Sequence, residues 1–220
     1  VCMLIKVTNQ TDVSAYDVVQ NLFPDKNKDF VFNITENDIV LVKEVKNNID
    51  VRDLEKLARS ISDTLSSEFF TKVNVGIGTP VVGVKDLARS FKEAQTALEV
   101  GKVFDTDKNI VSYDNLGIAR LIYHLPTTLC ETFLKEVFKK NSIESLDHET
   151  LFTIQKFFEN SLNVSETSRQ LFIHRNTLVY RLDKLQKSTG LDLRVFEDAI
   201  TFKIALMVVK YMKYMETYEY

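Results

Sequence analysis

The stretch NVSETSRQLFIHRNTLVYRLDKLQKSTG, residues Asn163–Gly190, predicts two short helices joined by a tight turn. Asn163 is a residue type that caps helix N-termini, and Glu166 stands three positions on, where a capping box would be completed. His174 occupies the capping position of the second helix, and Gly190 is a natural C-terminal stop. Both helices are therefore delimited by their own end signals.

The second of these helices, expected over residues 175–188, has two chemically distinct faces. Leu178, Leu182 and Leu185 recur at helical spacing and form one apolar stripe that we expect to be buried. The opposite face is polar and basic, and it carries Arg175, Asn176, Thr177, Tyr180, Arg181 and Lys184. Arg and Asn can read guanine and adenine by paired hydrogen bonds, whereas Thr, Tyr and Lys suit phosphate contacts. These six residues and His174 are the candidate DNA-binding residues of a helix-turn-helix whose second helix enters the major groove.

The local charge agrees with this interpretation. Between Arg169 and Arg194 six basic residues stand against Asp183 and Asp192, in a chain whose net charge is -3. An excess of positive charge on one segment is what binding to phosphates requires. An ordinary amphipathic helical hairpin with a solvated charged face is the competing interpretation of the same pattern.

The first half of the chain alternates strand-like and helix-like segments. The expected strands cover residues 3–8, 29–34, 38–45, 72–78 and 110–113. The expected helices cover residues 14–23, 51–69 and 87–98. The close spacing of the second and third strands favours a hairpin, and Gly101 is expected to end the last of the three helices. This order predicts an α+β fold in which one antiparallel sheet is covered by helices on one face.

Strand signals vanish from Gly117 onward. The expected helices cover residues 117–124, 127–140, 149–160, 164–171, 175–188 and 195–215. The predicted domains are an α+β domain at 1–123, a helical connector at 124–147 and an all-α helix-turn-helix domain at 148–220. No stretch is long and apolar enough for a bilayer span, so we expect a cytoplasmic protein without a membrane partner.

Two segments resemble parts of a known family. LFIHRNTLVYRLDKLQKSTGLDL, Leu171–Leu193, resembles the C-terminal helix-turn-helix of the PucR/CdaR family of bacterial transcription regulators, and the likeness extends over roughly Leu146–Val209. Val179 departs from the pattern, because a basic or polar residue is expected there. VGIGTPVVGVKDLARSFKEAQTALEVGK, Val75–Lys102, resembles the family's central domain, a degenerate relative of the ferredoxin/GGDEF-like cyclase fold.

The resemblance implies a DNA-binding transcription regulator that responds to a small metabolite. In this family the effector is expected to act through a further N-terminal sensor region, and a start at Val1 rather than Met agrees with a fragment that lacks it. Double-stranded DNA is the expected partner. We also expect a homodimer, since paired half-sites multiply the specificity of one recognition helix.

A nucleotide-binding or cyclase-like enzyme is the main alternative. Such chemistry needs carboxylates that hold a divalent metal against phosphates. The first hairpin turn reads NITEND, Asn33–Asp38, without paired glycines, and the end of the first strand offers only Asp12. The three histidines are dispersed. We therefore expect no catalytic residues, no metal site and no cofactor. A further alternative is an effector-binding module whose helical part only oligomerises.

Overall fold

The computed structural model describes residues 1–9, 14–138 and 146–218, and it forms two compact units, Val1–Tyr123 and His124–Tyr220. Two sequence expectations fall outside the described residues. They are the position of Asp12 and the end of the helix expected over residues 127–140. The division into domains at 1–123, 124–147 and 148–220 stays a prediction.

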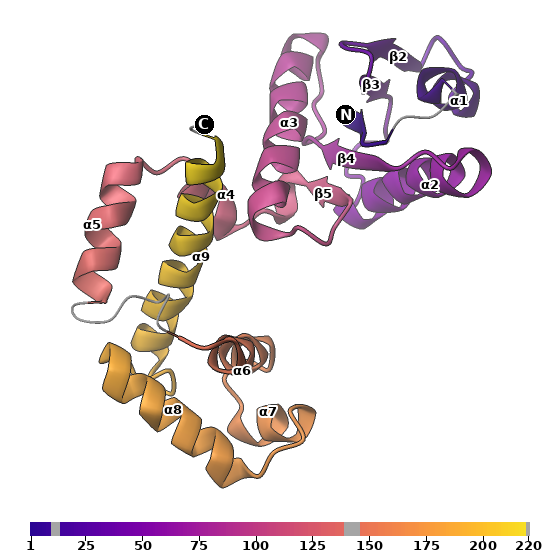
Figure 1. Cartoon of the computed structure of the whole chain (residues 1–220). Helices are drawn as coiled ribbons and strands as arrows, with labels where there is room; N and C mark the ends of the chain where they lie inside the picture. The colour runs from indigo at the N-terminus through magenta and orange to yellow at the C-terminus, as the bar shows by residue number, and fades with distance from the viewer. Residues whose placement is uncertain (10–13, 139–145, 219–220) are drawn as a thin grey trace. The chain divides into compact units, whose positions relative to one another are not determined.

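The N-terminal unit is an α+β fold built on one five-stranded sheet (Figure 1). Its strands are β1 Cys2–Val7, β2 Asp29–Asn33, β3 Asp38–Lys43, β4 Val73–Ile77 and β5 Ile110–Ser112. Its helices are α1 Ala15–Leu22, α2 Val51–Phe69, α3 Leu87–Phe104 and α4 Ile118–Tyr123, with single 3₁₀ turns at Val84–Asp86 and Tyr113–Asn115. The strands, α1 and α2 lie close to the bounds expected from the sequence, whereas α3 runs past its expected end.

The strands follow the order β2-β3-β1-β4-β5. β2 and β3 form the expected hairpin, in which Phe32 lies opposite Val40. β1 pairs antiparallel with both β3 and β4. β4 and β5 run parallel, with Val75 opposite Ile110, so the expectation of a fully antiparallel sheet is wrong at this pair. The reason is that α3 connects β4 to β5 as a crossover, which returns the chain in the same direction.

Helices cover both faces of the sheet, so the prediction of cover on one face is wrong. Met3 and Ile5 of β1 belong to a core shared with α1 and α2. Leu4, which alternates with them, packs with Ala94 and Leu98 of α3 on the opposite face. Figure 1 shows α3 on one side of the sheet and α1 and α2 on the other. Successive strand residues point to opposite faces, so a strand as apolar as β1 must be covered on both.

Gly101 lies inside α3 and does not end it, which corrects the expected stop. A Cβ atom at this position would come 2.8 Å from Cγ2 of Val111 in β5. The glycine therefore lets the helix approach the last strand closely. α3 continues to Phe104, and the N–H of Asp105 donates to the carbonyl of Gly101 at 2.9 Å.

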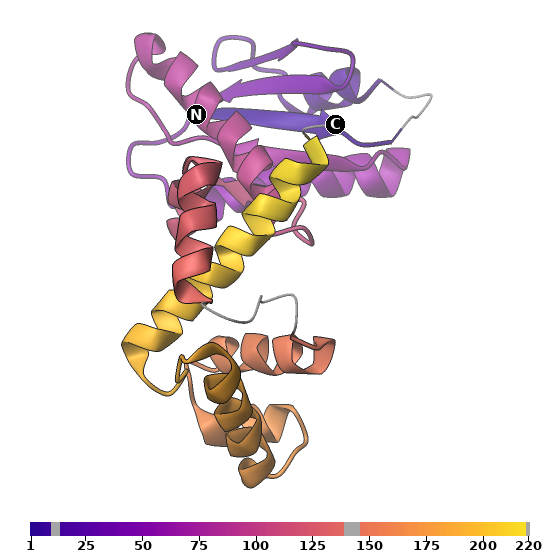
Figure 2. The same ribbon diagram turned by 60° about the vertical axis from the view of Figure 1, so that its left-hand side comes forward.

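The C-terminal unit is all-helical. Its helices are α5 Thr127–Val137, α6 His148–Glu159, α7 Val164–Gln170, α8 Arg175–Thr189 and α9 Phe196–Tyr218. α5 lies alongside α9 (Figures 1 and 2), and the hydroxyl of Tyr211 donates to the carbonyl of Leu125 at 3.3 Å. In the described part of the chain no helix is both long and apolar enough to cross a bilayer.

The core of the C-terminal unit is formed where α6, α8 and α9 meet. Its buried side chains are Ile154, Phe157, Leu178, Leu182, Leu185, Leu193 and Phe202. Phe138 meets Phe202 edge-to-face, with ring centroids 5.8 Å apart. This core fixes the orientation of α8 and hence of the side chains on its outer face.

Candidate nucleic-acid interface

α7 begins at the predicted cap. Oδ1 of Asn163 accepts a hydrogen bond from the N–H of Glu166 at 3.0 Å. The N–H of Asn163 donates to the carbonyl of Asn160, while the Glu166 carboxylate pairs with Arg169. The capping is therefore one-sided, and the reciprocal half of the expected capping box is replaced by an ion pair along the same helix.

The turn between α7 and α8 contains two neighbouring apolar residues, Phe172 and Ile173, whose side chains lie in different environments. The N–H of Ile173 donates to the carbonyl of Ser168 at 3.0 Å, and its side chain packs against the helical core. Phe172 takes a left-handed backbone conformation, with φ of 54°, and its side chain is 96% exposed. Of the two apolar residues of this turn, only Ile173 contributes to the core.

α8 has the predicted ends. Nδ1 of His174 accepts a hydrogen bond from the N–H of Asn176 at 3.2 Å, which satisfies one of the free donors of the first turn. Gly190 adopts φ of 82°, and its N–H donates to the carbonyl of Gln186 at 2.7 Å. The expected N-cap and C-terminal stop are both confirmed.

The predicted apolar stripe of α8 is buried. Leu178, Leu182 and Leu185 are each no more than 2% exposed and contact the core described above. Ser168 of α7 is also buried, and its small side chain allows the two helices to cross closely. Because the stripe is held inward, the other side of α8 faces solvent.

Most of the candidate residues are exposed on α8. His174, Arg175, Asn176 and Thr177 form a continuous exposed run at its N-terminal end. Further along the helix, Tyr180 and Lys184 are exposed, with Tyr180 at 67%. Tyr180, Arg181 and Lys184 follow Thr177 by three, four and seven residues. This spacing places all four residues on one face of the helix.

Three of the six basic residues between Arg169 and Arg194 form ion pairs within the C-terminal unit. Arg169 pairs with Glu166, Arg181 pairs with Glu149, and Arg194 pairs with both Asp183 and Asp192. The hydrogen bond from Arg194 holds the pKa of the Asp192 carboxyl below its usual value. The positive charge that faces outward is therefore smaller than the residue count of the segment suggests. Within the described residues, no ion pair is formed by Arg175, Lys184 or Lys187.

Arg181 links α8 to α6. Its Nη1 donates to Oγ1 of Thr153 at 2.9 Å, and its Nη2 pairs with the carboxylate of Glu149. The side chain is only 24% exposed. The sequence pattern could not indicate this link, since the partners lie 28 and 32 residues earlier in the chain.

Arg181→Ala is expected to lower the free energy of unfolding of the C-terminal unit by about 1–2 kcal/mol, because it removes a charged hydrogen bond and an ion pair between two helices. Arg175→Ala removes an exposed arginine of the same helix and should change stability by less than about 0.5 kcal/mol. Urea unfolding followed by circular dichroism measures both. Unchanged stability of Arg181→Ala together with lost DNA affinity would instead make Arg181 a direct contact.

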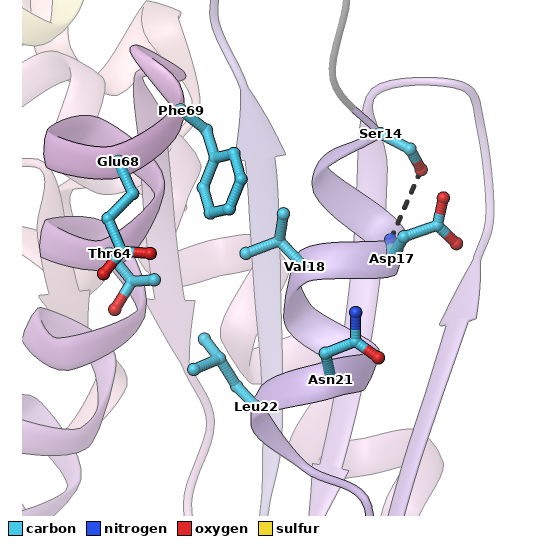
Figure 3. Close-up of a pocket in the computed structure, with 8 residues that line it drawn as sticks. All are labelled: Ser14, Asp17, Val18, Asn21, Leu22, Thr64, Glu68 and Phe69. Atoms are coloured by element: carbon cyan, nitrogen blue, oxygen red, sulfur yellow. Dashed lines mark hydrogen bonds between the residues drawn. The ribbon is translucent and has the colours of Figure 1, made fainter.

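The N-terminal unit has a shallow pocket between α1 and α2, with a volume of about 380 Å³ (Figure 3). Val18, Leu22 and Phe69 supply its apolar side. Its polar side consists of Ser14, Asp17, Asn21, Thr64 and Glu68. Asp17, Asn21 and Glu68 are exposed, so the pocket offers little area shielded from water and we assign it no ligand.

The turn between β2 and β3 is stabilised by its own side chains. Oγ1 of Thr35 accepts hydrogen bonds from the N–H groups of Asn37 and Asp38, and Asp38 also lies 3.7 Å from Nζ of Lys6. Glu36 is exposed at the tip. Among the residues that the structure describes, no three His, Cys, Asp or Glu side chains are grouped to hold a metal ion.

Comparison with known proteins identifies two domains in the chain. Residues 150–208 match the PucR C-terminal helix-turn-helix domain, which contains α7 and α8, and residues 1–100 match the GGDEF-like domain. The first match covers the face of α8 described above. The second covers the sheet from β1 to β4 together with α1, α2 and most of α3.

Three curated proteins are similar to this chain. The Carbohydrate diacid regulator of Escherichia coli (strain K12) is 27% identical over 84% of this chain and 49% of its own length. The Purine catabolism regulatory protein of Bacillus subtilis (strain 168) is 27% identical over 64% of this chain and 27% of its own length. The Proline-responsive transcriptional activator PutR of the same organism is 25% identical over 82% and 45%.

The chain thus spans about half, or less, of the length of these curated relatives. The matches to the first and third of these relatives cover more than four fifths of the chain and therefore reach both units. The chain thus combines a GGDEF-like domain with a PucR C-terminal helix-turn-helix domain, and it is similar to curated regulators of the PucR/CdaR type.

Proposed function

We propose that this chain is the DNA-binding part of a transcription regulator and that α8 reads double-stranded DNA in the major groove. The observation that carries the proposal is the exposed run Arg175, Asn176 and Thr177 at the start of a helix whose opposite side is locked into a core. The N-terminal residues of a recognition helix are the ones that reach base edges. The names of the curated proteins similar to this chain describe regulators, which supports the same function.

The candidate residues divide into two roles. Arg175 and Asn176 have the side chains that form paired hydrogen bonds with guanine and adenine, so we propose that they read bases. His174, Thr177, Tyr180 and Lys184 flank them and suit contacts with phosphates, which set the register of the helix. Arg181 completes the sequence-derived set, and its link to α6 supports a positioning role for it.

The proposal extends to the domains and the partners. Residues 148–220 would bind DNA, residues 124–147 would connect the two domains, and residues 1–123 would form the GGDEF-like domain. The match over residues 150–208 supports the first of these assignments.

The protein would act in the cytoplasm as a homodimer on paired half-sites. The relatives' names refer to carbohydrate diacids, purine catabolism and proline, which supports a small metabolite as effector. We place that effector in a sensor region outside residues 1–220.

Arg175→Ala is expected to weaken binding to a specific site by roughly 1–3 kcal/mol, about fivefold to 150-fold, and to leave binding to random DNA nearly unchanged. A shift assay at fixed salt, with a fragment enriched from a random pool and with random DNA as competitor, measures the difference. Asn176→Ala should behave in the same way.

Lys184→Ala is the matched control on the same helix. It should weaken binding to both DNAs alike and reduce the slope of log affinity against log salt by about one, because one phosphate contact is lost. Specific affinity that survives Arg175→Ala would show that α8 does not enter the groove as proposed.

We also propose that the GGDEF-like domain is not a nucleotide cyclase. The turn Asn33–Asp38 lacks paired glycines, and its carboxylate Asp38 is held near Lys6. Incubation of the chain with GTP and Mg²⁺ or Mn²⁺ should give no cyclic nucleotide product by liquid chromatography. Turnover that persists after repeated purification, and that Glu36→Gln abolishes, would contradict this part of the proposal.

A further inference from the structure

β2 lies at the edge of the sheet, and half of its backbone groups point away from the protein. The N–H of Ile34 donates to the carbonyl of Asp38, and the carbonyl of Lys28 accepts from the N–H of Glu44. Even-numbered residues of this strand therefore direct their backbone groups toward β3. Since these groups alternate along an antiparallel strand, the outward-directed groups belong to Asp29, Val31 and Asn33. The N–H of Asp29 already donates to the carbonyl of Asp25 at 2.9 Å, so the pairing of this edge depends on Val31 and Asn33.

β2 and the residue that follows it display three large apolar side chains on one face. Phe30, Phe32 and Ile34 are 54%, 46% and 50% exposed. Phe30 and Phe32 lie opposite Val42 and Val40, which pack on the side of the sheet that α3 covers. α3 extends over β1 and β4 (Figure 1), so no described helix of the N-terminal unit lies above this outer part of the face.

An edge of this kind is normally protected in monomeric proteins. Charged side chains, proline or a bulge in the strand prevent pairing with another chain. Between Phe30 and Asn33 the strand has no charged residue and no proline. Asp29, at its start, is neutralised by Lys43, whose Nζ lies 2.7 Å from the carboxylate. The edge of β2 is therefore free to pair and apolar enough to gain from it.

The charges at the two ends of β2 are opposite. The end before the strand carries Lys26 and Lys28, with Asp25 as a weak exposed partner of Lys28 at 3.8 Å. The turn after the strand carries the exposed Glu36. Antiparallel pairing of two such strands brings the positive end of each beside the negative end of the other, whereas parallel pairing would bring like charges together.

We propose that β2 pairs antiparallel with β2 of a second copy of this chain and joins the two sheets into one. The twofold axis passes between the two Phe32 residues, which lie directly opposite as a pair without mutual backbone hydrogen bonds. Val31 of each copy then exchanges hydrogen bonds with Asn33 of the other, and Phe30 lies beside Ile34. This inference rests on the proposed function in one respect, namely that the regulator acts as a dimer.

Cysteine cross-linking tests the register. In Phe32→Cys the two new thiols would sit where Cα atoms are about 4.5 Å apart, within the range that a disulfide spans. In Phe30→Cys they would be about 13 Å apart along the strands, so this variant is the matched control. Mild oxidation without DNA should convert most of Phe32→Cys to a covalent dimer and little of Phe30→Cys. The native Cys2 and Cys130 are buried and should not react.

Charge reversal tests the direction of pairing by a second measurement. Lys28→Glu and Glu36→Lys should each raise the dimer dissociation constant roughly tenfold, because each creates two like-charge contacts across the twofold axis. The double variant, Lys28→Glu with Glu36→Lys, should recover most of the affinity. Lys85→Glu reverses an exposed lysine away from the edge and should have no effect. Sedimentation equilibrium measures all four.

The outcomes separate this interface from DNA binding. A dimer in solution that Phe32→Cys does not cross-link, or that the charge-reversed variants leave intact, would overturn the interface while leaving the proposed function in place. A purely monomeric chain would overturn the interface as well. A cross-linked dimer without specific DNA affinity would uphold the interface and contradict the proposed function.

Discussion

Phe202→Ala is expected to lower the free energy of unfolding of the C-terminal unit by about 3–5 kcal/mol. Phe202 is fully buried, and it contacts a core to which α6, α8 and α9 all contribute. Truncation removes its apolar burial and its edge-to-face contact with Phe138, and it leaves a cavity that helices on several sides cannot readily fill. The loss is a large fraction of the total stability of a small domain.

Phe196→Ala is the matched control for this prediction. Phe196 lies in the same helix and is 65% exposed, so its truncation should change stability by less than about 0.5 kcal/mol. Urea unfolding followed by circular dichroism measures both variants, and hydrogen exchange assigns the loss to the C-terminal unit. Equal effects of the two substitutions would show that the core is not centred on Phe202.

Phe202→Ala should also weaken DNA binding. Leu178, Leu182 and Leu185 hold α8 against the core that contains Phe202. When that core loosens, the exposed run at the start of α8 is no longer held in one orientation. At a temperature where part of the protein is unfolded, affinity should fall in proportion to the folded fraction.

Gly78→Ala is expected to destabilise the N-terminal unit by about 3 kcal/mol, the upper end of the usual cost of overpacking. A Cβ atom at this position would come 1.9 Å from the carbonyl oxygen of Ser90 in α3. This carbonyl oxygen belongs to the backbone of α3, so the whole helix would have to move. Oγ of Ser90 also accepts from the N–H of Cys2 and donates to the carbonyl of Thr79, and these bonds resist such a shift.

Gly83→Ala is the control for the glycine substitution. A Cβ atom there meets nothing closer than Oδ2 of Asp86 at 4.0 Å, and the backbone is extended. Stability should stay the same or rise slightly, because alanine reduces the freedom of the unfolded chain. Thermal unfolding of the two variants gives the comparison. A Gly78→Ala protein as stable as Gly83→Ala would contradict the close packing of α3 on β4.

Local patterns in the sequence predict much of this architecture. The stripe of Leu178, Leu182 and Leu185, the cap at His174 and the stop at Gly190 all follow from the spacing of a few residues, and the structure confirms them. The hairpin of β2 and β3 was predictable for the same reason, since its signal lies within a short stretch. Such features depend on the backbone of one or two elements.

Features that depend on distant contacts were not predictable in this way. Gly101 resembles a helix stop in sequence, but its role is to admit β5 beside α3. The partners of Arg181 come from another helix, so the sequence could place this residue only by the face that it shares with Lys184. The continuous apolar run at the start of β1 was the one available signal that helices cover both faces of the sheet.

Selection from a pool of random double-stranded DNA shows whether α8 reads DNA sequence. We expect the recovered fragments to share one motif, arranged as two inverted half-sites whose centres lie about one helical turn, or a multiple of it, apart. The same selection with Arg175→Ala should recover a different or weaker motif. If the folded protein enriches no motif over the starting pool, α8 does not read DNA sequence.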